Sequence, residues 1–303
     1  MEPVDEIFSD VRIATLNIDK LPQATFELLS MLFYEASDEP RFVSVTRVHD
    51  VITLVADAQR LEALPGLEVD PTEWAVIRQA DALDEVGAIR RLTSPLADAG
   101  ISVFHLSTYD AEVILVPRAR LSDALGCFDR TAPAEPASSS ATEVYYTHSY
   151  PLEVLEQHRT TIVRLEKQYA QWHMGALLRL LFLPRPGDPE QAVVSLTESL
   201  DGEISILAEV APWWREHCDA LPAGLSSVDQ EEMVPICIRN AALNETGVVA
   251  AMASVLSENQ ISILGCSTLS GGELATDFTF VPLSQVEKAT KAFEAAGFLI
   301  TKC

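Results

Sequence analysis

The residues with the clearest chemical potential form a short run, Asn244-Glu245-Thr246-Gly247-Val248-Val249, at the start of an expected helix. A glycine lets the backbone come close to a ligand, and the unpaired N–H groups of a helix start attract a carboxylate. The α-carboxylate of a free amino acid suits such a position. Glu245 and the later Asp277 can then hold a cationic end, and a guanidinium prefers planar carboxylate partners. This pattern indicates a site for a cationic amino acid.

The same run has a purely structural interpretation. Asn244 is a suitable N-cap, and Glu245 favours the positive end of a helix dipole. Asp84-Glu85-Val86-Gly87 begins another expected helix in the same way, so a shared helix start explains both copies equally well. The sequence leaves both interpretations open.

Nearby polar residues do not form a recognisable catalytic set. Ser102 and Ser262 alternate with apolar neighbours on expected strands, where a hydroxyl serves a ligand or a structural hydrogen bond equally well. His105 is more typical of a packed histidine than of a catalyst. The run from Gly265 to Leu269 lacks the second glycine of a nucleophile elbow. We therefore expect that the protein has no hydrolase activity and, more broadly, that it is not an enzyme.

Metal and cofactor motifs are missing from the sequence. Gly271-Gly272 has no following lysine, and no Walker or dinucleotide-binding pattern occurs. The six histidines lack HxxxH and HExxH spacing, and the five cysteines lack any CxxC pair. We expect no metal and no cofactor.

The charge balance narrows the classes of partner. A formal charge of −24 repels phosphate backbones and anionic membranes and favours cationic ligands. The sequence has no basic leader with an apolar run, and no apolar stretch of the roughly 20 residues that span a bilayer. Scattered cysteines fit a reducing compartment. We predict a cytoplasmic protein that binds neither nucleic acid nor membrane.

An internal repeat organises the chain. Residues 84–108 return as residues 244–268 with eight identities in 25 aligned positions. The identical pairs are Glu85/Glu245, Gly87/Gly247, Ser94/Ser254, Leu96/Leu256, Ile101/Ile261, Ser102/Ser262, Ser107/Ser267 and Thr108/Thr268. A repeat of this length indicates two related halves and makes a symmetric ligand site plausible.

Each half divides again into two modules that read strand, helix, strand, strand, helix, with a further strand in places. The expected elements include a helix over Leu21–Tyr34, a helix over Gln171–Phe182, and strands over Ile101–Thr108 and Ile261–Thr268. This order predicts an α+β fold of ferredoxin-like modules, each an antiparallel sheet with helices on one face. The expected divisions are modules at 1–70, 71–130, 154–226 and 227–303, with a linker and connecting strand at 131–153 that includes the Ala/Pro/Ser-rich run Thr131–Thr142.

Five blocks of sequence resemble a known family. They are ISVFHLSTYDAEVILVP (101–117), RLLFLP (179–184), VSLTE (194–198), NETGVV (244–249) and the paired ST and DFTFVP segments (267–268 and 277–282). These blocks are similar to the CASTOR family, cytosolic arginine sensors built from four tandem ACT domains. The second and fourth modules also carry the acidic residue and glycine at a helix start that are typical of ACT domains.

The resemblance implies a non-catalytic sensor. Arginine would lie between the second and fourth modules, a GATOR-like protein complex would be released, the TOR kinase pathway would be activated, and the protein would form a homodimer. The implied ligand residues are Ser102, Val103, Asn244, Glu245, Thr246, Gly247, Val248, Val249, Thr268, Leu269 and Asp277.

The sequence departs from the family pattern at a few of these positions. Asn244 and Thr246 stand where arginine binders have Asp and Cys, and Leu269 replaces an aromatic residue. The loop Ser270–Thr276 is longer than the family's turn, which would either form a lid or move Asp277 out of register. An allosteric subunit of an amino-acid biosynthetic enzyme is the alternative function, because it would also bind an amino acid.

Overall fold

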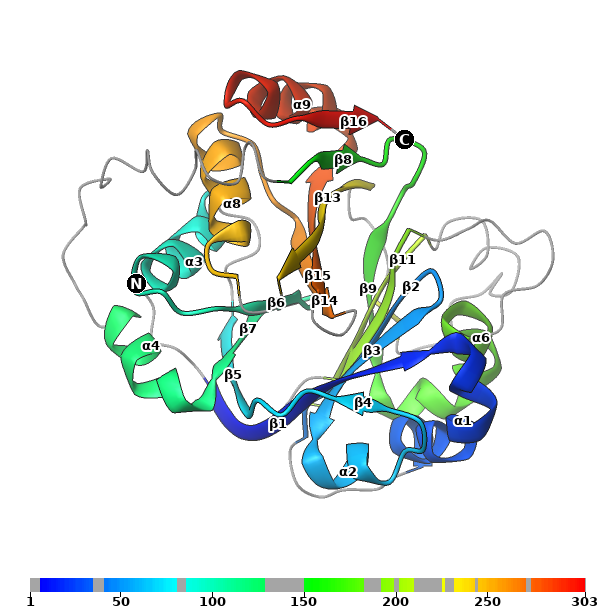
Figure 1. Ribbon diagram of the computed structural model, residues 1–303. Coiled ribbons are helices and arrows are strands. Elements are labelled where there is room, and N and C mark those ends of the chain that lie inside the picture. The colour runs from blue at the N-terminus through cyan, green and yellow to red at the C-terminus, as the bar shows by residue number, and fades with distance from the viewer. Residues whose placement is uncertain are drawn as a thin grey trace. The chain divides into compact units, whose positions relative to one another are not determined.

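The computed structural model describes residues 6–34, 41–80, 86–128, 150–182, 192–198, 202–209, 225–226, 232–242, 245–270 and 274–302. The chain forms two compact units, each assembled from separate stretches of sequence (Figure 1). Unit 1 comprises Met1–Ser9, Thr72–Gln157 and Met233–Cys303, and unit 2 comprises Asp10–Pro71 and His158–Glu232. Each unit is a mixed α/β structure whose strands pair antiparallel, except that β16 (Ile300–Lys302) pairs parallel with β8 (Leu152–Val154) in unit 1.

Unit 2 contains two strand–helix–strand–strand segments. The first has β1 (Glu6–Asn17), which belongs to unit 2 from Asp10 onward, and a 3₁₀ turn (Ile18–Lys20). It continues with α1 (Leu21–Leu29) and its π-helical extension (Ser30–Tyr34), β2 (Val43–Val48), β3 (Val51–Asp57), α2 (Ala58–Glu62) and β4 (Glu68–Val69). The second has β9 (Thr161–Glu166), a 3₁₀ stretch (Lys167–His173), α6 (Met174–Leu181), β10 (Val194–Glu198), β11 (Glu203–Ala208) and β12 (Leu225–Ser226). The strand order is β12-β9-β11-β10-β2-β3-β1, and β4 pairs with β1.

The two segments of unit 2 join where β10 pairs with β2. Hydroxyl groups hydrogen-bond across this pair, Ser44 to Thr197 at 2.9 Å and Thr46 to Ser195 at 2.8 Å. At its end Arg41 binds Glu198 through two bonds, from Nε at 2.9 Å and from Nη2 at 2.6 Å. This fork-to-carboxylate pair is buried, so it ties the segments together in a low-dielectric setting.

Unit 1 also contains two such segments. The first has β5 (Trp74–Ala80), α3 (Ala88–Asp98), β6 (Phe104–Ser107), β7 (Ala111–Pro117), a 3₁₀ turn (Arg118–Arg120) and α4 (Leu121–Phe128), and β8 (Leu152–Val154) follows. The second has β13 (Met233–Ala242), α8 (Val248–Glu258), β14 (Gly265–Ser270), β15 (Leu274–Pro282), a 3₁₀ turn (Leu283–Gln285), α9 (Val286–Ala295) and β16 (Ile300–Lys302). The strand order is β5-β7-β6-β14-β15-β13-β8-β16, so β6 and β14 join the segments.

Helix burial explains how unit 1 holds its strands. Helix α3 buries one apolar stripe, including Ile89, Leu92 and Leu96, as its spacing predicts. Helix α8 is buried at every residue from Val248 to Leu256, because it contacts α3, α9 and β15. A helix that is apolar on all sides belongs inside a core. The packing around α8 therefore holds its first turn in place.

Several expected elements are confirmed and others differ in extent. The Leu21–Tyr34 helix is present, with π geometry in its last five residues. The α-helix expected from Gln171 begins only at Met174, because the preceding turn is 3₁₀. No helix in the described part of the chain is long and apolar enough to cross a membrane.

Two expectations near the predicted site need correction. Ser102 and Ser262 precede their strands, which begin at Phe104 and Gly265; the Ser262 N–H donates to the Gln285 side chain at 3.2 Å instead of to a strand. The two ends of the expected loop Ser270–Thr276 are paired strand, since Ser270 pairs with Ala275 and Leu269 with Thr276, and residues 271–273 lie outside the described residues. Asp277 therefore lies within paired strand. Residues 131–142 lie outside the described residues.

Candidate functional site

The first turn of α8 has the geometry expected of a ligand-binding helix start. Gly247 lies in the left-handed region at φ 91°, which a residue with a side chain rarely adopts. The helix begins with the 2.8 Å bond from the Ala251 N–H to the Gly247 carbonyl. The N–H groups of a first turn have no intrahelical acceptor, so they are suited to an anionic group. Val248 and Val249 are buried below them.

Glu245 is held beside this turn by a residue that the sequence did not single out. The Tyr150 hydroxyl donates to Glu245 Oε2 at 2.6 Å. Tyr150 comes from the expected linker and connecting strand, just before β8, and no sequence pattern marks it. Glu245 and Thr246 are both partly exposed, whereas Asn244 lies outside the described residues.

Asp277 on β15 is a buried carboxylate, only 5% exposed. Thr268 faces it across the hairpin and donates from Oγ1 to Asp277 Oδ1 at 2.7 Å. Burial raises the pKa of Asp277 to about 6, while the Thr268 hydrogen bond and the nearby His105 lower it and the charge of Glu245 raises it. These electrostatic effects place His105 and Glu245 near Asp277.

The raised pKa of Asp277 makes the stability of the fold depend on pH. Because the folded-state pKa of about 6 lies above the ordinary pKa of an aspartate, Asp277 stabilises the fold most at low pH, where it is protonated. That contribution is lost as the pH rises through about 6, when a buried charge forms. A cation bound beside the carboxylate would offset this loss.

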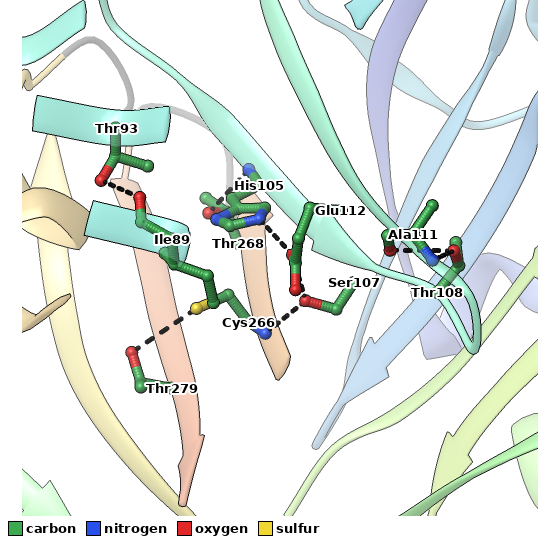
Figure 2. A network of polar contacts seen from close by, with 10 residues as sticks. All are labelled: Ile89, Thr93, His105, Ser107, Thr108, Ala111, Glu112, Cys266, Thr268 and Thr279. Atoms are coloured by element: carbon green, nitrogen blue, oxygen red, sulfur yellow. Dashed lines mark hydrogen bonds and ion pairs between the residues drawn. The ribbon is translucent and has the colours of Figure 1, made fainter. Parts of the chain in front are cut away.

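The strand pair β6–β14 links two hydroxyl–carboxylate pairs, Thr268–Asp277 and Ser107–Glu112, in a reciprocal way. Figure 2 shows the Ser107–Glu112 pair and the Thr268 hydroxyl. The backbone N–H of His105 donates to Thr268 Oγ1 at 3.1 Å, so the Thr268 hydroxyl is free to donate its own hydrogen to Asp277. In the mirror arrangement the Cys266 N–H donates to Ser107 Oγ at 2.7 Å, and the Ser107 hydroxyl donates to Glu112 at 2.6 Å. Each strand therefore orients the hydroxyl of the other.

This network changes the equivalences that the aligned repeat suggests. The alignment matches Ser107 with Ser267, but the structure gives Ser107 and Thr268 the same role. A shift of one residue along a strand moves a side chain to the opposite face, so Ser267 cannot take that role. Sequence identity identified the repeated strands but not their hydrogen-bonding positions.

The other predicted site residues are placed unequally. Ser102 and Val103 immediately precede β6, three and two residues before His105, and the Val103 side chain packs on the core beneath α3. Leu269 alternates with Thr268 on β14, so its buried side chain points to the opposite face from Asp277. The structure thus brings together Thr268 and Asp277, and the charge of Glu245 acts on Asp277.

Metal binding and thiol chemistry find little support in the described residues. They contain no group of three or more His, Cys, Asp or Glu side chains that could hold a metal ion. Burial, followed by the charge of Glu112, raises the pKa of the Cys266 thiol. Since the thiolate is the nucleophile, such a buried thiol is poorly reactive. The arrangement is suited to holding a charged ligand.

Comparison with known proteins finds a family model that matches two segments of the chain. Residues 71–129 and 229–295 match the family model of the ACT domain. These two segments are therefore similar to ACT domains. They contain the two halves of the β6–β14 junction, and all of the predicted ligand residues fall within them.

Relatives of known name extend the similarity along most of the chain. The cytosolic arginine sensor for mTORC1 subunit 1 of Rattus norvegicus is 24% identical over 291 residues, covering 85% of this chain and 88% of the relative. Its Homo sapiens counterpart is 25% identical over 293 residues with the same coverage. The resemblance to cytosolic arginine sensors is therefore confirmed. An aspartate kinase structure from Synechocystis aligns at 14% identity and a TM-score of 0.34, covering 97% of this chain and 56% of that one, which is too remote to indicate function.

Proposed function

We propose that this protein is a non-catalytic cytosolic sensor that binds L-arginine at the junction of its two ACT domains. Asp277 carries the proposal, because a buried carboxylate with an oriented hydroxyl partner is costly to ionise unless a cation binds it. The names of the relatives support arginine as that cation.

Each end of the ligand has a proposed partner. The α-carboxylate would meet the first turn of α8 at Gly247, Val248 and Val249, and the guanidinium would bind Asp277 with Glu245 nearby. Thr268 would orient Asp277, and Ser102 and Val103 would line the side that precedes β6.

We also propose that the whole chain consists of four ACT-type modules within the divisions 1–70, 71–130, 154–226 and 227–303. Support comes from the shared strand–helix–strand–strand order of both segments in each unit. Ligand would alter binding to a GATOR-like complex that signals to the TOR kinase, and the protein would act as a homodimer. Affinity capture from cells with and without arginine, with mass spectrometry of the captured proteins, tests the partner.

Titration calorimetry should show that arginine binds and that citrulline, its uncharged isostere, binds at least about tenfold more weakly. The reason is that a charge-assisted hydrogen bond contributes about 1.5–3 kcal/mol, which a neutral urea group does not supply. Lysine should also be weaker, because its ammonium cannot bind a carboxylate in a planar fork. Equal affinity for arginine and citrulline would contradict a carboxylate-based site.

Arginine affinity should fall about tenfold from pH 7.5 to pH 5. With a pKa of about 6, Asp277 is mostly ionised at the higher pH and mostly protonated at the lower one, and only the ionised form attracts the cation. Calorimetry at the two pH values measures the change. Asp277→Asn should bind weakly at both, and a wild-type affinity that does not change with pH would contradict the assignment.

A further inference from the structure

The β6–β14 junction is symmetric in its hydrogen bonds and asymmetric in one side chain. His105 and Cys266 hold equivalent positions on β6 and β14. The backbone N–H of each donates to a hydroxyl of the other strand, and that hydroxyl in turn donates to a carboxylate. Helices α3 and α8 also start alike, at Gly87 with φ 86° and at Gly247 with φ 91°. Both segments of unit 1 thus carry the same helix start and the same hydroxyl–carboxylate pair.

The two carboxylates differ in what binds them beyond the hydroxyl. His105 Nε2 lies 2.6 Å from Glu112 Oε2, in a pair whose members are 0% and 1% exposed (Figure 2). At the equivalent place Cys266 does not bond Asp277; its sulfur contacts Thr279 Oγ1 at 3.8 Å. An imidazole therefore holds Glu112, whereas Asp277 has a thiol in the corresponding position.

Two atoms of the His105–Glu112 pair retain capacity for a partner. Within the described chain, His105 Nδ1 and Glu112 Oε1 are buried without a hydrogen bond. Buried polar atoms normally find partners, so an unpaired carboxylate oxygen marks a position where a donor would be stabilising. Glu112 accordingly has the chemistry of Asp277 and differs in being occupied by an internal side chain.

We propose that His105 acts as a built-in partner that reserves Glu112, and so restricts a cationic amino acid to Asp277. Removing the imidazole would make Glu112 a second acceptor for a guanidinium, equivalent to Asp277 in the other segment. The inference rests on the proposed function for the identity of the ligand, and it goes further by assigning a role to His105: this residue sets the number of ligands bound.

The test is the number of arginine molecules bound per chain, measured by titration calorimetry. His105→Cys, which copies Cys266, should bind one more equivalent than wild type. His105→Gln should not, because its amide still donates to Glu112. In His105→Cys/Glu112→Gln the added equivalent should disappear. Thermal denaturation checks that each variant is folded. A folded His105→Cys protein with no added equivalent overturns the inference.

A second variant decides the matter if His105→Cys does not fold. Glu112→Gln in the otherwise wild-type protein should change arginine affinity by less than about threefold, because Glu112 does not bind the ligand. A loss of more than about tenfold would place Glu112 in the ligand site and overturn the inference. The proposed function fails separately, if wild type binds no arginine; the inference would then still require His105→Cys to gain one equivalent.

Discussion

Asp277→Asn should weaken arginine binding by about tenfold to a hundredfold, which corresponds to the roughly 1.5–3 kcal/mol of a charge-assisted hydrogen bond. Asparagine keeps the size of the side chain and can still accept the bond from Thr268 Oγ1. The substitution therefore removes the charge with little change in packing. Calorimetric titration of both proteins with arginine at neutral pH measures the loss.

A matched control separates this local effect from the general acidic field. Asp123 on α4 belongs to the same unit, is 63% exposed and pairs with Arg120 at 2.7 Å. Asp123→Asn removes the same charge from the protein and should leave arginine affinity within about twofold, because exposed charges are screened by salt. Equal losses from the two variants would show that net charge, not a site at Asp277, attracts the ligand.

The apo Asp277→Asn protein provides a further check on the electrostatic argument. Since ionised Asp277 destabilises the fold above a pH of about 6, the uncharged variant should lose less stability than wild type as the pH rises from 4 to 7. Thermal denaturation across this range reports the difference. A variant that weakens binding and is at least as stable as wild type at neutral pH would assign the effect to ligand contact instead of misfolding.

Glu198→Ala should destabilise unit 2 by about 3–5 kcal/mol, the usual loss when one member of a buried ion pair is removed. Glu198 and Arg41 are 2% and 4% exposed, so the variant leaves a guanidinium in the interior without its bidentate partner. The 2.5 Å contact with Lys167 is lost as well. Denaturant unfolding measures the change in the free energy of unfolding.

Glu203→Ala is the control for this prediction. Glu203 also binds an arginine through two bonds, to Arg164 at 2.5 Å each, but Arg164 is 41% exposed. Solvent can hydrate the arginine that is left, so the expected loss is below about 1 kcal/mol. Similar losses from both variants would mean that water reaches the Arg41–Glu198 pair.

Sequence alone determined the elements and the chemistry of the helix start. Period 2 and period 3.6 patterns predicted the strands and helices of both segments of unit 1, because burial of one face controls those positions. Gly247 and Glu245 could be selected because a helix start with glycine and an acid has a recognisable chemistry. The repeat of residues 84–108 at residues 244–268 also predicted matching elements, and helices α3 and α8 do begin at matching positions.

Tertiary structure decided which polar groups meet. Ser107 takes the role of Thr268, although the aligned repeat pairs it with Ser267, because strand register depends on pairing between distant segments. Tyr150 reaches Glu245 across 95 positions of sequence, a contact that no local pattern encodes. His105 binds Glu112, whereas Cys266 at the equivalent position contacts Thr279 and not Asp277. This difference depends on the direction of the side chains at the β6–β14 junction. Local periodicity fixes which face is buried, and only the folded chain fixes which buried charge faces a partner.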